Sequence, residues 1–196
     1  MQENERLKKS SFGYITLYFM VPVIVIAVCY GAMAVTKVIG NTAVALAFGP
    51  IIVAILWWVL LGKPLYSMRT KKMEGELDAA GFRRNQTFTA DGCTVIVDQT
   101  SGKLAILFRW NPFRYYVFPA SRITKTWVDD GKTGAGIFAG SGRVSFLFIV
   151  DGIRVRVNTF TSNQRWKMED PKILEAISKA DMMVQVLDEA KQASRV

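Results

Sequence analysis

The part of the chain closest to a chemical motif is residues 130–133 (DGKT), which contain the GKT of a phosphate-binding loop. Such a loop surrounds nucleotide phosphates with backbone N–H groups and a lysine, and a helix follows it. It also requires a glycine five residues before Gly131, where this chain has Thr126. Asp129 and Asp130 would repel the phosphates. We therefore interpret the segment as a connection between strands and expect no nucleotide there.

Glycines recur through residues 131–142 and predict a loop rather than a dinucleotide fingerprint, because Gly140 falls one position too late for that motif. Glycine lets backbone amides approach an anion or another chain closely. Phe138 is an apolar residue within this loop. Two interpretations are open for it: burial against the rest of the domain, or insertion into a partner or a membrane surface.

The chain has no histidine and two cysteines, Cys29 and Cys93. The absence of imidazole excludes serine or cysteine catalysis through histidine, as well as histidine-ligated zinc, and two thiols are too few for an all-cysteine zinc site. Asp129 and Asp130 are adjacent on a predicted strand, so they point to opposite faces. We expect no catalytic residue, no cofactor and no metal. Two thiols without a disulfide framework favour a reducing compartment.

Positive charge gathers on one predicted strand face. In residues 153–157 apolar side chains alternate with Arg154 and Arg156, so one face is buried and the other is basic. Arg143 lies on the neighbouring predicted strand. Arginine binds phosphate through two parallel hydrogen bonds, which makes these three residues candidates for contact with anionic headgroups or with a partner. The alternative is a solvated strand face that binds nothing.

Antiparallel strands and one helix must position these residues. The predicted strands are residues 93–98, 103–109, 115–118, 123–130, 143–150 and 153–160, with a loop at 110–113. Asp151 and Gly152, between the last two strands, are typical of a type I′ turn. A helix is predicted to begin at Pro171 with Asp170 as its N-cap. Its apolar stripe, which predicts packing on the sheet, is Ile173, Ile177, Ala180, Val184 and Leu187.

Two apolar runs, residues 12–35 and 42–62, precede this part of the chain, and neither contains a charged side chain. Each is long enough for a helix that crosses a hydrocarbon core of about 30 Å, and the short linker makes the two helices antiparallel. The first run is longer than the apolar part of a signal peptide, so we interpret it as a retained span. The expected interface anchors are Tyr14, Trp57, Trp58 and Lys63.

Basic residues flank the two runs unequally. The N-terminal flank and the segment after the second run are rich in lysine and arginine, whereas the linker has only Lys37. The positive-inside rule then predicts two spans with both termini and the soluble domain in the cytoplasm. The 25 basic and 16 acidic residues give a net charge of +9, which an anionic bilayer surface explains without nucleic acid.

The predicted organisation has three parts. Residues 1–63 form the tail and the two-helix hairpin, residues 64–84 a connector, and residues 85–196 a cytosolic domain. The connector mixes apolar, basic and acidic residues. It is either an amphipathic helix at the headgroups or a solvated linker helix.

The sequence TVIVDQTSGKLAI at residues 94–106, followed by PASRI at 119–123, is similar to bacterial pleckstrin-homology-like (PH-like) domains, and the resemblance covers residues 88–190. It implies an antiparallel sandwich or barrel capped by a C-terminal amphipathic helix, within an α+β class. Such bacterial proteins commonly carry a two-helix membrane hairpin. The resemblance further implies binding of proteins, peptides or lipid headgroups and no enzymatic activity, although a fold alone does not establish a function.

These observations predict a non-enzymatic protein of the bacterial inner membrane. Its cytosolic PH-like domain would bind a partner protein, and the protein would act as a subunit or adapter of a membrane-bound assembly. The partner is another protein or a further copy of the same chain. The first alternative is a module that senses anionic phospholipids through its basic strand face. The second, an enzyme at the membrane surface, has no nucleophile or carboxylate arrangement to support it in the sequence.

Overall fold

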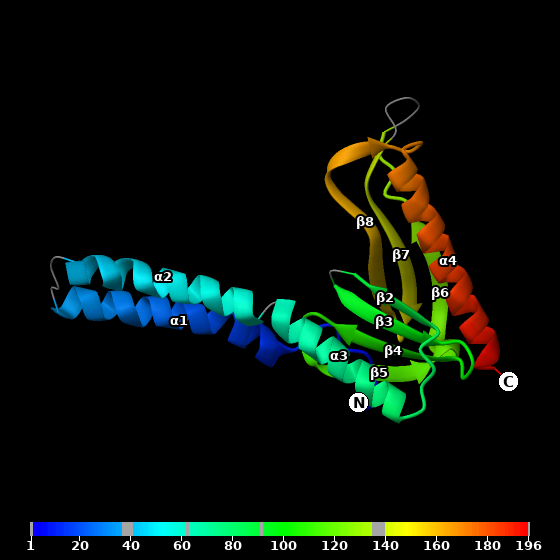
Figure 1. Ribbon diagram of the computed structural model, residues 1–196, viewed down its shortest axis with the longest axis horizontal. Helices are drawn as coiled ribbons and strands as arrows, with labels where there is room; N and C mark the ends of the chain where they lie inside the picture. Colours follow the sequence, from blue (N-terminus) through cyan, green and yellow to red (C-terminus); the bar gives the residue numbers. More distant parts are fainter. Residues whose placement is uncertain (1, 37–40, 62, 91, 135–139, 196) are drawn as a thin grey trace.

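The computed structural model describes residues 2–36, 41–61, 63–90, 92–134 and 140–195. Helices α1 (Phe12–Thr36) and α2 (Asn41–Leu61) form a long hairpin that projects from an α+β body (Figure 1). Both are long and apolar enough to cross a membrane, and their described side chains are largely exposed. The two predicted apolar helices are therefore confirmed in length and composition.

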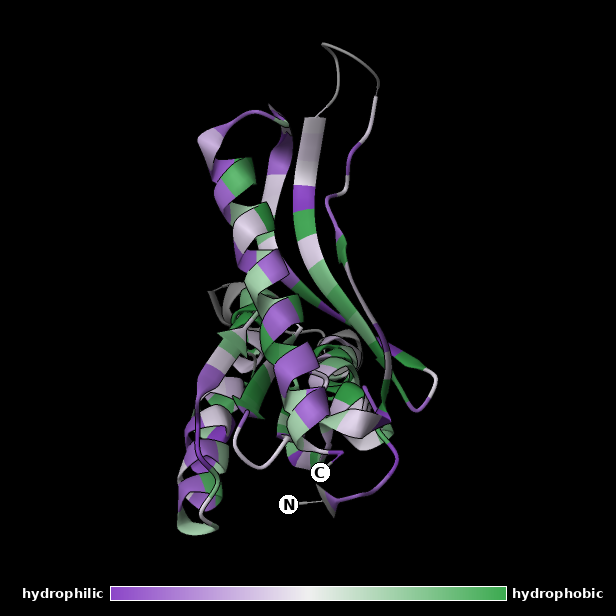
Figure 2. Cartoon of the chain, turned by 90° about the vertical axis from the view of Figure 1, so that its right-hand side faces the viewer, coloured by the Kyte–Doolittle hydropathy of each residue, from purple (hydrophilic) through white to green (hydrophobic). Residues whose placement is uncertain are grey.

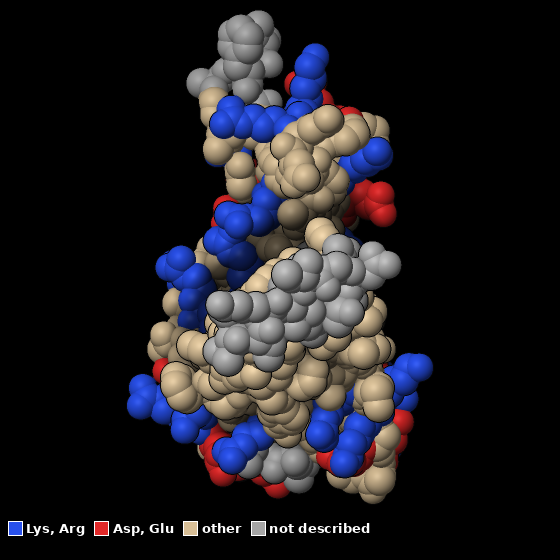
Figure 3. Space-filling model, turned by 90° about the vertical axis from the view of Figure 1, so that its left-hand side faces the viewer, with Lys and Arg blue, Asp and Glu red and all other residues tan. Residues whose placement is uncertain are grey.

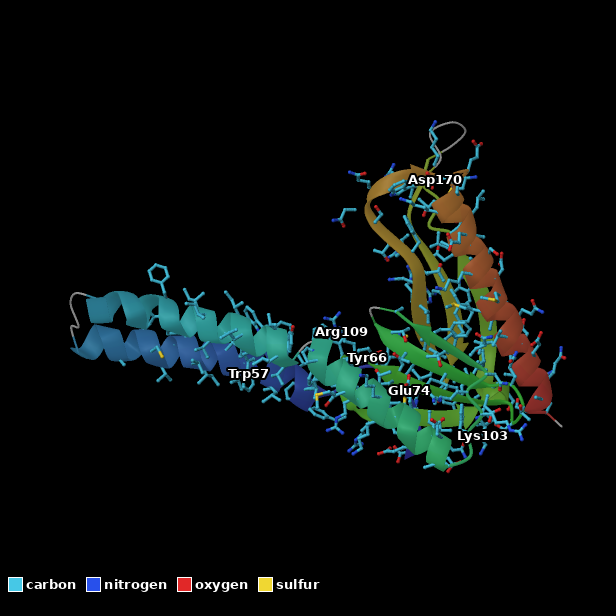
Figure 4. All side chains as sticks on the ribbon, in the orientation of Figure 1. Trp57, Tyr66, Glu74, Lys103, Arg109 and Asp170 are labelled. Carbon is cyan, nitrogen blue, oxygen red and sulfur yellow. The ribbon has the colours of Figure 1, made fainter. Side chains whose placement is uncertain are left out.

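Hydrogen bonds between the two helices fasten the hairpin close to the body. Pro22 has no backbone N–H, so the carbonyl of Tyr18, four residues earlier, lacks its usual helical donor. Nε1 of Trp58 donates to that carbonyl at 2.8 Å, and Nε1 of Trp57 donates to the carbonyl of Leu17 at 3.3 Å. Figure 4 shows Trp57 in the part of the hairpin next to the body. Both tryptophans thus satisfy backbone carbonyls around the proline.

Replacing Trp58 by phenylalanine is expected to lower the stability of the hairpin by about 1 kcal/mol, because the Tyr18 carbonyl loses its donor. In a Pro22→Ala background the alanine N–H supplies the helical donor, and the same replacement should cost less than half as much. The measurement is a double-mutant cycle on thermal unfolding of the full chain in detergent. Equal costs in the two backgrounds would contradict this pairing.

The body contains two sheets, with strand orders β1-β5-β4-β3-β2 and β6-β7-β8, and all neighbours except β1 and β5 are antiparallel. The first sheet consists of β1 (Gln2–Glu3), β2 (Gln86–Thr89), β3 (Cys93–Asp98), β4 (Lys103–Phe108) and β5 (Asn111–Pro119). A 3-10 helix, η1 (Ala120–Arg122), leads to β6 (Ile123–Asp129), β7 (Gly140–Val150) and β8 (Ile153–Lys167). The predicted α+β class with antiparallel sheets is confirmed.

The predicted loop at residues 110–113 is wrong for its last three residues. β5 begins at Asn111, and the turn that precedes it is correspondingly short. Nδ2 of Asn111 donates to the carbonyl of Lys8 at 3.0 Å and to the hydroxyl of Tyr116 at 3.1 Å. These bonds hold the start of the strand against the N-terminal segment, a long-range contact that local sequence patterns do not report.

The hairpin of β7 and β8 is longer than predicted. β7 begins at Gly140, and Gly140 pairs with Lys167, so β8 keeps a partner well beyond the predicted end at residue 160. The type I′ turn between the strands is confirmed, because Asp151 and Gly152 have positive φ angles of 53° and 77°.

Helix α4 (Pro171–Ala193) packs along the second sheet, and its N-cap is confirmed, since Asp170 accepts a hydrogen bond from the N–H of Lys172. In Figure 2 polar residues mark the side of α4 that faces outward. Of the predicted stripe, Ile173, Ala180 and Leu187 are buried, and Ile177 and Val184 are half-buried but pack against the same core. The buried residues are Ile173, Ala176, Ala180, Met183, Val186, Leu187 and Ala190. Three alanines therefore share the buried face of the helix with four larger apolar side chains.

Helix α3 (Lys63–Ala79) occupies most of the predicted connector and lies on the outer face of the first sheet. Its Met73 and Leu77 pack with Ile96, Leu107 and Val117 of that sheet. It is therefore a packing helix of the body rather than a free linker. This contact explains why all six residues of β3 are buried, since α3 covers one face of the strand and the core covers the other.

The N-terminal segment belongs to the body and not to a free tail. β1 pairs in parallel with β5, and the N–H of Asn4 donates to the carbonyl of Val117 at 2.8 Å. Leu7 is only 2% exposed and lies in the core between the two sheets. The N–H of Ser11 donates to the carbonyl of Trp110 just before α1 begins. The chain thus runs along the surface of the body, with Leu7 inserted into the core, before it enters the hairpin.

Candidate functional site

The candidate site is the outer face of the second sheet. Val155 and Val157 of β8 point into the core, so Arg154 and Arg156 alternate to the opposite face. In the pairing of the strands, Ile149 lies opposite Arg154 on one side and Lys125 on the other. We call the side chains of Lys125, Trp127, Asp129, Arg154 and Arg156 on this surface the basic sheet face.

Trp127 of β6 holds two cations on the basic sheet face. Nζ of Lys125 lies 5.3 Å from the centre of the Trp127 ring, and Cζ of Arg154 lies 5.5 Å from it. Attraction between a cation and the ring quadrupole stabilises each of these contacts. It also keeps two like charges close together without a carboxylate between them, which favours the arrival of an anion.

Arg156 has one free donor group. Its Nη2 donates to Oδ2 of Asp129 at 3.0 Å, whereas its Nη1 is buried and has no hydrogen-bond partner. A buried unpaired donor is costly unless something binds it. Lys9 of the N-terminal segment adds a further charge nearby: burial lowers the pKa of its ammonium group, and Arg154 lowers that pKa further. Three cations and one carboxylate, Lys125, Arg154, Arg156 and Asp129, therefore share the basic sheet face.

The basic sheet face looks toward the same side of the molecule as the hairpin. In Figure 1 α4 covers the second sheet on the side away from the hairpin, which leaves the other face of the sheet uncovered. Figure 3 looks along the hairpin and shows, on the body behind it, Lys and Arg side chains around a hollow above the hairpin, with few acidic side chains among them. A membrane surface perpendicular to the axis of the hairpin would therefore face these cations.

The structure brings together two of the three arginines predicted from the sequence. Arg154 and Arg156 lie on one surface, and Arg143 is exposed farther along β7, opposite Thr161. Phe138 lies outside the described residues. Lys125, Trp127 and Lys9 were missed as site residues, although Lys125 and Trp127 carry the period-two signal of one strand face. Nothing in local sequence indicates that Arg154 acts on the pKa of Lys9.

The predicted interface anchors lie where the hairpin meets the body. Tyr14 is 2% exposed, and its hydroxyl donates to the carbonyl of Leu61 at the end of α2. Its ring contacts Tyr18, Trp110 and Phe113. Tyr14 therefore connects α1 with α2 and with β5, a structural role that is separate from its predicted role as an anchor at the membrane interface. The side chain of Lys63 lies outside the described part of the chain.

The charges on the basic sheet face suit recognition of anions. The described residues contain no cluster of three or more metal-ligating side chains. Cys93 is buried in the core, and burial raises the pKa of its thiol to about 12, so it stays protonated at neutral pH.

Comparison of the chain with models of protein families, with curated proteins and with solved structures finds no match.

Proposed function

We propose that this protein is a two-span protein of the bacterial inner membrane and that its cytosolic domain is a binding module without enzymatic activity. The basic sheet face binds the anionic headgroups of the membrane that holds the hairpin. The observation that carries the proposal is geometric: the hairpin and the uncovered, cation-rich face of the second sheet point to the same side of the body. Lys and Arg near an anionic leaflet contribute about 1 kcal/mol each.

The arrangement of strands supports a PH-like domain. Four consecutive antiparallel strands, β2 to β5, are followed by three more, β6 to β8, and then by helix α4. This is the order of elements that the sequence resemblance implies. The N-terminal β1 and helix α3 are additions that join the module to the hairpin. Such a joint limits the directions in which the module can face.

The proposed contact is tested by hydrogen exchange of the full chain in lipid nanodiscs. With 30% phosphatidylglycerol we expect β6 and β8 to exchange more slowly than in pure phosphatidylcholine, and 0.5 M salt should remove the difference. The double variant Lys125→Gln/Arg154→Gln should lose about 2 kcal/mol of this contact, which is roughly a 30-fold shift toward the undocked state. A matched variant, Lys179→Gln/Lys191→Gln on α4, should behave like the wild type. Equal exchange in both lipids would refute the proposal.

A partner protein or a second copy of the chain is the other candidate for binding. A Cβ placed on Gly31 would meet none of the described atoms within 4 Å, and Ala27 lies one helical turn away along α1. Small residues let helices of two chains pack closely in a bilayer. The same exchange experiment distinguishes lipid from protein as the binding partner. If a second protein chain covers the strands, their slow hydrogen exchange persists in pure phosphatidylcholine and becomes slower as the number of chains per disc rises.

A further inference from the structure

A second feature, separate from the basic sheet face, is a shallow pocket where the hairpin joins the body. It has a volume of about 170 Å³ and lies between α3 and the start of β5. Its floor is apolar and is formed by Met73, Leu107 and Pro112. Its remaining lining residues are Arg69, Lys72, Glu76, Phe113 and Tyr115. Cations above an apolar floor suit a ligand with a charged head and an apolar remainder.

Arg69 is the cation most available to a ligand in this pocket. Its Cζ lies 5.6 Å from the centre of the Phe113 ring, which orients the guanidinium at the pocket. Among the ion pairs of the described residues none involves Arg69. A guanidinium presents a fork of donors that matches a phosphate.

The carboxylate in the pocket is already engaged. Oε2 of Glu76 accepts a hydrogen bond from the Tyr115 hydroxyl at 2.8 Å, and Oε1 lies 3.7 Å from Nζ of Lys72. Both carboxylate oxygens therefore have partners within the protein, and Lys72 balances part of the Glu76 charge. This leaves the charge of Arg69 to attract an anionic ligand.

The pocket lies at the height of the headgroups if the hairpin crosses a bilayer. Arg69 follows the end of α2 by eight residues, about 12 Å along a helix, and α3 is inclined to the hairpin, which shortens the distance along the membrane normal (Figure 1). Phe113 contacts Tyr14 of α1 and is 46% exposed. An exposed aromatic ring between hairpin and pocket offers a path for an acyl chain.

We infer that this pocket binds one anionic phospholipid, with its phosphate on Arg69 and its chains along the hairpin. The occupant is a lipid rather than a soluble phosphate because the apolar floor adjoins the exposed Phe113, whose ring contacts Tyr14 at the start of α1. The inference shares with the proposed function only the membrane-spanning hairpin. A lipid held here would bridge α3, β5 and the base of the hairpin.

The test is native mass spectrometry of the full chain, purified in detergent, freed of lipid and titrated with dioleoyl phosphatidylglycerol. We expect one lipid per wild-type chain and binding at least tenfold weaker for Arg69→Gln, since a charge-assisted bond to phosphate is lost. Lys71→Gln removes the same charge from the same helix outside the pocket and should bind like the wild type. Phosphatidylethanolamine should bind more weakly, and glycerol 3-phosphate should not compete.

Several results would overturn the inference. Unchanged binding by Arg69→Gln would do so, as would an equal loss in Lys71→Gln, which would indicate general attraction of charge. Displacement of the lipid by glycerol 3-phosphate would indicate a soluble ligand. Thermal unfolding of the lipid-free variants checks that they fold, and Arg69→Lys, which keeps the charge but loses the fork, should bind at an intermediate level. Arg154→Gln should leave lipid binding at the Arg69 pocket unchanged. The effect of this variant on the basic sheet face is therefore measured independently of the pocket.

Discussion

Replacing Leu7 by alanine is expected to lower the free energy of unfolding of the body by about 3 kcal/mol, the usual range for a buried leucine being roughly 2 to 5 kcal/mol. Leu7 is 2% exposed and lies in the core with residues of both sheets and of α4, so its removal leaves a cavity. Urea unfolding of the full chain in detergent, followed by circular dichroism, measures the change.

The matched control for Leu7 is Leu174→Ala. Leu174 is 53% exposed on α4, so the same replacement should change the free energy of unfolding by less than about 0.5 kcal/mol. Similar losses for both variants would show that Leu7 does not pack as described. A large loss for Leu7 alone would show that the segment before the hairpin is a structural part of the body.

The second large effect is expected at Asp98, the last residue of β3, whose side chain supports the turn that follows. Its Oδ1 accepts from the N–H groups of Thr100 and Ser101, and its Oδ2 accepts from the N–H of Arg83, just after α3. Asp98→Ala would remove all three bonds at a residue that is 3% exposed. We expect a loss of about 3 kcal/mol in urea unfolding at pH 7, because backbone donors are left unpaired.

The contribution of Asp98 should depend on pH. Burial by itself raises the pKa of its carboxyl group, but the hydrogen bonds from Ser101, Arg83 and Thr100 outweigh burial, and the net pKa is lowered. A lowered folded-state pKa stabilises the fold above the unfolded value of about 3.9, and that stability is lost as pH falls through the folded value. The difference between wild type and Asp98→Ala should therefore be full at pH 5 to 7 and shrink below pH 4.

The control for Asp98 is Asp181→Ala on the exposed side of α4. It removes the same charge without a turn to support, so its effect should stay within about 0.5 kcal/mol at every pH. Asp98→Asn keeps one acceptor oxygen and should lie between the wild type and the alanine variant. A difference between Asp98→Ala and the wild type that does not change between pH 7 and pH 3 would contradict the role of the carboxylate.

Local patterns predicted the elements of the body well where neighbours in sequence also pair in space. The strand at residues 93–98 and the turn at Asp151 were predicted correctly, because alternation and turn chemistry are local properties. The start of β5 at Asn111 and the extension of β8 to Lys167 were not, because each depends on a distant partner strand or segment.

For the candidate sites, the sequence identified the charged residues, and the structure identified the residues that they contact. Arg154 and Arg156 were predicted on one basic face, but the contact of Arg154 with Trp127 and the unpaired Nη1 of Arg156 required the pairing of β6 with β7 and β7 with β8. Arg69 carried no sequence signal of its own. Its pocket exists only because α3 lies on the first sheet beside the start of β5.

The sequence by itself determined that two uncharged helices, an antiparallel α+β domain and a basic strand face occur in this chain, because composition and periodicity depend on each residue and its near neighbours. Tertiary structure alone decided which way the basic sheet face points, that Leu7 and β1 complete the body, and that α3 packs on it. Those features arise from contacts between segments far apart in the chain, and no local pattern encodes the geometry of such contacts.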